Sequence, residues 1–266
     1  MNYICPVCGE LLIMETKSYR CINNHSYDIA RQGYVNLLVV QQQHSLNPGD
    51  TRQQVLARRE FLSSGAYAPI VEMLITAAKK HMAAGPILDV GCGEGYYCTQ
   101  LAAAIGAELT GIDISKEAVR CAAAKYKTAD WLCATASHLP LQDQSVGIIT
   151  SLFALTIEKE FRRVLKPNGL YFKILAAEDH LLGLKGIIYP ELKTKEKDTI
   201  PALEGFDLME SIPIRFQFTA EGKMVQNLLS MTPHAHRISK DGAQRLADTY
   251  QLTDTASCVL NIYKAI

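Results

Sequence analysis

Short hydrophobic runs alternate with longer amphipathic stretches through the middle of the chain. Strands and helices that alternate in this way form a parallel sheet with helices packed on both of its faces. The pattern therefore predicts an α/β fold with a doubly wound sheet, whose ligand is expected at the carboxyl ends of the strands. The predicted strands are Ile87–Val90, Ala107–Ile112, Trp131–Ala134, Val146–Leu152 and Gly169–Leu175, and the predicted helices between them are Tyr96–Ala104, Lys116–Tyr126 and Ile157–Leu165.

Further elements are predicted on both sides of this core. The turn Pro48-Gly49-Asp50 ends in a residue type that favours the N-cap of a helix, so Asp50 is the expected cap. Two strands near the C-terminus can form an antiparallel edge of the sheet. The predicted elements are helices at Thr51–Ser63, Tyr67–His81, Leu181–Tyr189 and Lys223–Met231, and strands at Leu11–Met14, Ile212–Phe218 and Cys258–Tyr263.

The strand that ends at Val90 runs into a turn with glycines at alternate positions, Gly91, Gly93 and Gly95. Glycine lets the backbone turn sharply and approach a ligand closely. The spacing differs from the Gly-x-Gly-x-x-Gly of dinucleotide sites, where a diphosphate faces a helix N-terminus, and it suits a nucleoside without phosphate. Asp113, at the end of the second strand, is placed to accept hydrogen bonds from ribose hydroxyls. These residues resemble the S-adenosylmethionine site of class I methyltransferases, which implies their Rossmann-like sheet; the alternative is a generic nucleotide-binding sheet.

Four potential metal ligands, Cys5, Cys8, Cys21 and His25, open the chain with the spacing Cys-x2-Cys-x12-Cys-x3-His. Two cysteines separated by two residues, joined by a second pair across a short hairpin, supply a tetrahedral set of sulfur and nitrogen ligands. Four protein ligands leave no open position, so the spacing predicts a structural zinc site. The alternative is a set of unrelated buried cysteines.

Composition and charge narrow the possible settings of the protein. The 266 residues are 48% hydrophobic, and no apolar run approaches the roughly 20 residues of a membrane helix. The chain starts without the pattern of a signal peptide, and its eight cysteines then indicate metal binding rather than disulfides, so a cytoplasmic protein without a membrane partner is expected. The 27 basic and 27 acidic residues exclude a strongly basic protein that coats nucleic acid. An RNA substrate would need a local basic patch. Arg52, Arg58 and Arg59 on one predicted helix form either such a patch or a solvated face.

Motifs along nearly the whole chain resemble the bacterial 23S ribosomal RNA guanine-N1 methyltransferases. Beside the four-ligand zinc segment, they are Gly33–Leu38, Pro48–Asp50, Ala57–Arg59, Gly65-x-Tyr67-x-Pro69, Asp89–Tyr97, Leu184–Gly186 and Met231–Pro233. The resemblance implies zinc ligands at Cys5, Cys8, Cys21 and His25, and cofactor contacts at Tyr67, Gly93, Glu94 and His180. In such folds Gly91 also admits the cofactor, Asp113 holds its ribose, and Ser137 lies where the adenine edge is met.

The resemblance further implies an enzyme that uses S-adenosylmethionine and a structural zinc ion. Its expected reaction is methylation of N1 of a guanine in a hairpin loop of 23S ribosomal RNA, by a homodimer. The predicted division is a zinc-binding domain (1–36), a helical linker (37–85) and a methyltransferase domain (86–266). The target guanine and the group that removes the N1 proton stay open, so no catalytic residue is assigned.

Two departures from the family pattern bear on activity. Relatives have an aromatic-Ala-Pro-Cys run after the fourth strand, where this chain has Phe153-Ala154-Leu155-Thr156, and a tryptophan where this chain has His236. Two other readings follow: a small-molecule methyltransferase, favoured by zero net charge but not by the zinc segment, or a non-catalytic RNA-binding relative. The Asn-or-Asp-Pro-Pro-aromatic motif of enzymes that methylate exocyclic amines does not follow the fourth strand, which argues against methylation of adenine N6 or cytosine N4.

Overall fold

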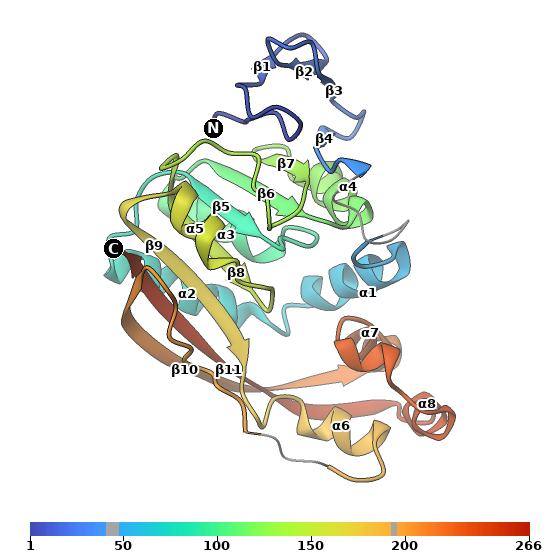
Figure 1. The fold of residues 1–266 in the computed structure, drawn as a ribbon. Coiled ribbons are helices and arrows are strands. Elements are labelled where there is room, and N and C mark those ends of the chain that lie inside the picture. The colour runs from blue at the N-terminus through green and yellow to red at the C-terminus, as the bar shows by residue number, and fades with distance from the viewer. Residues whose placement is uncertain (41–47, 193–195) are drawn as a thin grey trace.

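A mixed eight-stranded sheet forms the centre of the computed structural model (Figure 1). The structure describes residues 1–40, 48–192 and 196–266; residues 41–47, in the predicted linker, lie outside this description, as do residues 193–195. The strand order is β10-β11-β9-β8-β5-β6-β7-β4, parallel from β4 to β9 and antiparallel at β11 and β10. The strands are β4 (Tyr34–Asn36), β5 (Ile87–Val90), β6 (Leu109–Asp113), β7 (Asp130–Cys133), β8 (Val146–Leu152), β9 (Leu165–Ala176), β10 (Phe206–Glu221) and β11 (Gln251–Ala265).

The predicted doubly wound class I methyltransferase fold is confirmed, and each predicted core strand and helix is present. The helices of the core are α2 (Ala68–Lys80), α3 (Tyr96–Ile105), α4 (Lys116–Lys125) and α5 (Glu158–Val164). Successive strand residues point to opposite faces, so both faces of the sheet can be buried. Ile87 and Ile148 share one hydrophobic cluster with α2, α3 and α4, while Leu88 and Ile149 share the other with Phe161 of α5.

The N-terminal segment is built from β1 (Ile13–Met14), β2 (Ser18–Arg20) and β3 (Ser26–Asp28), which form a separate small sheet. The next strand, β4, joins the main sheet beside β7, although the predicted division assigns these residues to the zinc-binding domain; the division itself stays a prediction. The Tyr3 hydroxyl donates to Asp130 (2.6 Å) and lies 3.0 Å from the hydroxyl of Thr110. The zinc-binding segment is therefore attached to the sheet by hydrogen bonds and by burial.

Helix α1 (Arg52–Ser63) begins one residue later than its predicted cap implies. The predicted cap at Asp50 is wrong, because Thr51 caps the helix: its hydroxyl accepts from the Gln54 N–H, and the Gln54 side chain accepts from the Thr51 N–H. Among the described residues, no single helix is long and apolar enough to cross a membrane. Helices α1 and α2, bent by 76°, meet the length and composition criteria only as a pair, and both bury side chains in the core.

Beyond the core, β10 and β11 extend as a long antiparallel ribbon past the end of the sheet (Figure 1). This ribbon carries α6 (Leu182–Ile188), α7 (Lys223–Ser230), the short 3-10 helix η2 (Pro233–His236) and α8 (Lys240–Ala247). Helix α7 contacts α1 through Lys223 and Asn227, whose side chains both bind the carboxylate of Glu60. The ribbon therefore faces the linker helix, next to the carboxyl ends of the core strands.

Candidate functional site

The glycine turn lies between β5 and α3, at the carboxyl end of β5. Gly91, Gly93 and Gly95 all have positive φ angles (+76°, +56° and +84°), which side chains other than glycine rarely adopt. A Cβ atom on Gly95 would lie 2.5 Å from the ring of Trp131, so glycine is required there for space as well. The turn therefore has the backbone conformation that its glycines predict, and its contact with a cofactor stays a prediction.

Asp113 is joined directly to this turn. Its carboxylate accepts hydrogen bonds from the N–H groups of Gly93 (2.9 Å) and Ser115 (2.8 Å), and burial raises its pKa. Asp89, below the turn, accepts from the Thr150 hydroxyl (2.9 Å), and burial raises its pKa to about 6. The fold thus brings the glycine turn and the acid of the second strand together. Asp89 is buried, and its carboxylate binds the Thr150 side chain.

Two buried side chains, Glu94 in the turn and Tyr67 at the start of α2, lack hydrogen-bond partners among the described residues. Among the described residues, both carboxylate oxygens of Glu94 and the hydroxyl of Tyr67 are unpaired, although each residue is only 2% exposed. Buried polar atoms are normally paired, because an unpaired one costs about 1–3 kcal/mol. Burial raises the pKa of Glu94, against the opposing charges of Lys125 and Arg59. These unpaired atoms and the glycine turn fit a ligand with hydrogen-bonding groups, as S-adenosylmethionine has.

Tyr67 reaches this region from the start of α2. Its ring makes edge-to-face contacts with Phe61, Phe216 and Phe218, so the linker helices and β10 hold it in place. Tyr97, in the first turn of α3, has both Tyr67 and Arg58 among its electrostatic neighbours. The contact of Tyr67 with the cofactor stays a prediction.

His180 and Phe153 form an aromatic pair at the same edge of the sheet. Nδ1 of His180 accepts a hydrogen bond from the Ser257 N–H (3.1 Å), and burial lowers the pKa of His180 to about 4. The Phe153 ring lies 6.1 Å from the imidazole and is 40% exposed. Ser137, after β7, is exposed, and its hydroxyl lies 2.9 Å from that of Thr135. The roles of His180 and Ser137 toward a cofactor stay predictions.

Arg58 is a residue whose place the sequence did not reveal. Its Nη1 atom lies 2.5 Å from Oδ2 of Asp50 and would lie 3.5 Å from a Cβ atom on Gly93. Next to it is a cavity of about 360 Å³ lined by residues that include Asp50, Ser115 and Cys133. The position of Arg58 depends on how the linker folds back over the sheet, and neither spacing nor periodicity encodes that.

The four predicted zinc ligands converge on one point, with their ligand atoms within 4.8 Å of one another. The sulfur atoms of Cys8 and Cys21 are 3.7 Å apart, and Nδ1 of His25 lies 3.5 Å from the sulfur of Cys5 and 3.4 Å from that of Cys21. In a tetrahedron with Zn–S of about 2.3 Å and Zn–N of about 2.0–2.1 Å, the S–S and S–N edges are about 3.8 and 3.5 Å. The ligands therefore fit zinc, and the sulfur atoms are much too far apart for a disulfide bond of about 2.05 Å.

Two neighbours support these ligands. The Tyr27 hydroxyl lies 3.2 Å from the sulfur of Cys5, where it can donate to a thiolate. A hydrogen bond from Asn23 is the largest cause that lowers the pKa of Cys8, to about 6. Contacts of this kind orient metal ligands and stabilise their charged form.

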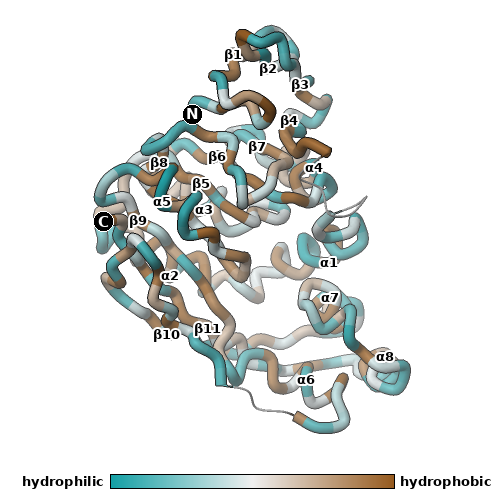
Figure 2. The backbone as a smooth tube through the Cα atoms, in the orientation of Figure 1, coloured by the Kyte–Doolittle hydropathy of each residue, from teal (hydrophilic) through white to brown (hydrophobic). Residues whose placement is uncertain are grey.

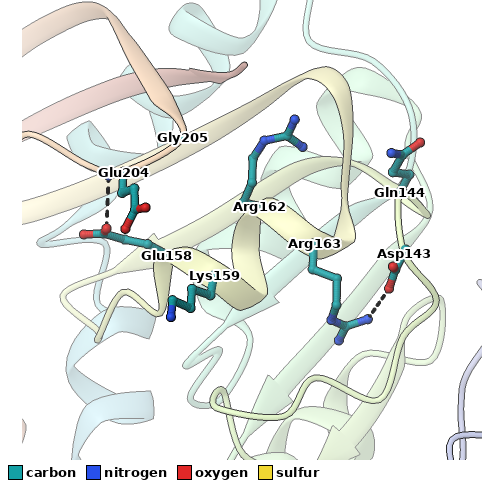
Figure 3. Close-up of a pocket in the computed structure, with 8 residues that line it drawn as sticks. All are labelled: Asp143, Gln144, Glu158, Lys159, Arg162, Arg163, Glu204 and Gly205. Atoms are coloured by element: carbon teal, nitrogen blue, oxygen red, sulfur yellow. Dashed lines mark hydrogen bonds and ion pairs between the residues drawn. The ribbon is translucent and has the colours of Figure 1, made fainter.

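A second hollow, of about 440 Å³, lies near the amino ends of β8 and β9, at the opposite end of the strands from the glycine turn (Figure 3). Its charged groups bind one another: Arg163 pairs with Asp143 (2.8 Å), and the Glu158 carboxylate accepts from the Glu204 N–H (3.0 Å). Ligands of doubly wound sheets bind at the carboxyl ends of the strands, so this hollow is not the expected cofactor site.

Comparison with known proteins adds to this geometry. The family profile described as "RlmA, N-terminal" matches residues 3–46, and the profile "Methyltransferase domain" matches residues 88–172. The 23S rRNA (guanine(748)-N(1))-methyltransferase of Streptomyces fradiae is 36% identical over 185 residues, which cover 68% of this chain and 65% of that protein. This alignment spans just under two thirds of the Streptomyces protein.

Two further relatives have names that assign them provisionally as 23S rRNA (guanine-N(1)-)-methyltransferases. The protein of Micromonospora griseorubida is 37% identical over 204 residues, covering 68% of this chain and 67% of that protein. YxjB of Bacillus subtilis is 30% identical over 259 residues, covering 92% of this chain and 90% of that protein. The similarity thus extends from the zinc ligands through the glycine turn to the C-terminal ribbon. The chain belongs to the family of 23S rRNA (guanine-N1)-methyltransferases.

Proposed function

We propose that this protein methylates N1 of a guanine in a hairpin loop of 23S ribosomal RNA and uses S-adenosylmethionine as the methyl donor. The observation that carries the proposal is the combination, in one chain, of a four-ligand zinc segment and a glycine turn hydrogen-bonded to Asp113. The relatives that are similar over most of the chain are named for this reaction.

When bound, S-adenosylmethionine supplies an electrophilic methyl group on its sulfonium. The protein then has to align this group with the base and keep water away. Glu94 in the glycine turn and Tyr67 at the start of α2 offer buried polar atoms without partners among the described residues, and Asp113 offers its carboxylate to the ribose. Zinc, held by Cys5, Cys8, Cys21 and His25, would fix the N-terminal segment without a role in methyl transfer.

The loop after β8 is the part of the chain expected to face the target base. Phe153 and Leu155 are 40% and 78% exposed there, so the loop presents apolar surface. The end of this loop is anchored to β9, because the Thr156 hydroxyl binds the hydroxyl of Tyr171 (2.7 Å) and the ammonium of buried Lys173. The family resemblance implies Pro-Cys at the positions of Leu155 and Thr156, so the hydroxyl that makes these bonds belongs to a residue at which this chain departs from the family pattern.

A hairpin loop suits this chemistry because an unpaired guanine exposes its Watson–Crick edge, which a duplex conceals. We propose that the zinc-binding segment holds the stem. Because the net charge is zero, one chain offers little basic surface, and a homodimer would double it. A ribosomal RNA substrate also implies that the protein works in the cytoplasm.

The experiment that tests the function is transfer of tritium from labelled S-adenosylmethionine to 23S RNA fragments, compared with transfer to a metabolite extract. Label is expected in a hairpin fragment, and mass spectrometry should identify 1-methylguanosine in its loop. The matched control is the same hairpin with its loop guanines replaced by adenines, which should accept no label. Label in metabolites alone would support a small-molecule methyltransferase, and no transfer to either would support a non-catalytic relative.

A further inference from the structure

Arg58 extends from α1 across the glycine turn. Its Nη1 and Cδ atoms would lie 3.5 and 3.9 Å from a Cβ atom on Gly93, so the side chain packs against the turn at Gly93. The side chain of Arg58 is 26% exposed, and its other guanidinium nitrogen, Nη2, lies 3.5 Å from the carbonyl oxygen of Met231. Arg58 is therefore held between the linker and the C-terminal ribbon, and it points at the turn.

The segment before α1 fastens this arrangement to the sheet. The Asp50 carboxylate binds Arg58, and the Asp50 carbonyl oxygen accepts a hydrogen bond from the Ser115 hydroxyl (2.6 Å). Ser115 follows Asp113 closely and donates its N–H to the Asp113 carboxylate. A continuous set of contacts thus links Arg58, through Asp50 and Ser115, to the acid expected to bind the ribose.

The charges around the turn are of opposite sign. Glu94 directly follows Gly93 and has two buried oxygens without partners among the described residues. The Arg58 guanidinium approaches the same turn from α1; its charge acts on Asp113 and Tyr97, and on Glu94 after the charges of Lys125 and Arg59, and it opposes the rise in pKa that burial causes in each. A guanidinium and a carboxylate on one turn are complementary to a zwitterion, the form of the amino acid end of S-adenosylmethionine.

We propose that Arg58 binds the α-carboxylate of the methionine moiety of S-adenosylmethionine, while Glu94 binds its α-amino group. In the structure, Arg58 already pairs with one carboxylate, that of Asp50, through Nη1. An arginine can bind a carboxylate through two parallel hydrogen bonds, which gives specificity as well as affinity. The inference rests on the proposed use of S-adenosylmethionine and gives Arg58 a role toward the cofactor instead of a role toward RNA.

The test is calorimetric binding of two ligands to the full-length, zinc-loaded protein. S-adenosylmethionine carries the carboxylate, and decarboxylated S-adenosylmethionine lacks only this group. The parent protein is expected to prefer the first ligand by about 10- to 100-fold, the effect of a charged hydrogen bond. In Arg58→Met, affinity for S-adenosylmethionine should fall by a similar factor, whereas affinity for the decarboxylated ligand should not change.

A matched control is Arg120→Met on α4, which removes an arginine paired with Glu117 and should keep the parental preference. Arg58→Lys keeps the charge and should retain part of the preference, and this variant replaces Arg58→Met if thermal unfolding shows the latter to be misfolded. Equal losses for both ligands in Arg58→Met, or parental binding of both, would overturn the proposal. Parental cofactor binding with weakened hairpin binding would assign Arg58 to RNA. If the parent binds neither ligand, the proposed function fails instead.

Discussion

A Cβ atom added to Gly91 would lie 2.6 Å from the Cβ atom of Ala154, so the glycine turn after β5 and the loop after β8 are in direct contact. Part of the surface expected to bind the cofactor therefore supports the part expected to face the base.

Gly91→Ala should therefore weaken both binding and folding. The new methyl group overlaps Ala154, at about 1–3 kcal/mol, and the positive φ angle adds about 1 kcal/mol. Denaturant unfolding and cofactor calorimetry measure the two effects. Gly106→Ala is the control, since Gly106 also has a positive φ angle (+66°) but no heavy atom within 4 Å of the added Cβ. Equal losses of stability in the two variants would show that the contact with Ala154 is unimportant.

The zinc site predicts a metal content of one zinc ion per chain. Metal analysis of protein purified without added metal should give a near-equimolar value. Cys21→Ser should lose the zinc and expose the N-terminal segment to proteolysis, because binding of the metal supplies folding free energy. Cys121→Ser, which changes a cysteine of α4 outside the cluster, should keep both zinc and protection. Folded, active parent protein with little zinc would contradict the site.

His180 should make stability depend on pH in a defined window. Burial lowers its pKa to about 4, from an ordinary value of 6.5, so between these pH values the unfolded chain binds more protons than the folded one. The contribution of neutral His180 is present above pH 6.5 and is lost as the pH falls toward 4. Lys185, Lys197 and His234 act in the same direction.

The variant that isolates this effect is His180→Asn, which keeps an acceptor for the Ser257 N–H but does not titrate. Between pH 7.5 and pH 5 the parent should lose roughly 1–2 kcal/mol more of its unfolding free energy than the variant does. His138→Asn, at an exposed histidine, should behave like the parent. An identical pH profile for His180→Asn and the parent would argue against a buried, neutral His180.

The attachment of the N-terminal segment depends on the Tyr3 hydroxyl. Tyr3→Phe keeps the ring but leaves Asp130 and Thr110 without this partner, at about 1–3 kcal/mol. Hydrogen exchange should become faster in β4 and in residues 1–12, with cofactor affinity unchanged. Tyr19→Phe, at the ring that contacts Tyr3 edge to face, is the control and should leave exchange unaltered. Unaltered exchange in Tyr3→Phe would mean that apolar burial alone holds the segment.

The sequence predicted the features whose chemistry demands particular residues at fixed spacing. The glycine turn, Asp113 and the zinc ligands are of this kind, as are the core strands β5 and β8, which are buried along their whole length. Strands β2, β3 and β4 were missed because three residues are too few to show a period. Helix α8 was missed as well, and β10 and β11 are far longer than predicted.

The remaining errors are of two kinds: a local capping box, Thr51-x-x-Gln54, that was missed in favour of Asp50, and the direction of Arg58, which depends on contacts between distant parts of the chain. Asp50 has the side chain of a helix cap, yet it binds Arg58, and Thr51 caps the helix instead. Arg58 looked like one of three basic residues on a solvated or RNA-binding face. Its direction depends on the packing of the linker against the sheet, which local sequence does not specify.

The outer surface of the zinc-binding segment is another such feature. Ile13 and Met14 of β1 are 64% and 66% exposed, and the tube is brown at β1 in Figure 2. Apolar strand residues would ordinarily be assigned to a core. Here the segment is too thin to enclose them, because its buried residues Tyr3 and Leu12 already belong to the hydrophobic cluster of the main sheet.

The pairing of β4 with β7 also has a consequence for the order of events during synthesis. All four zinc ligands lie within the first 25 residues. The strand with which β4 pairs, β7 (Asp130–Cys133), is synthesised about 100 residues after Tyr34. At about 5–20 residues per second, the ribosome needs roughly 5–20 s to supply it. During that interval the zinc-binding segment has no main sheet to pack against. Bound zinc must therefore stabilise the fold of this segment until β7 has been synthesised.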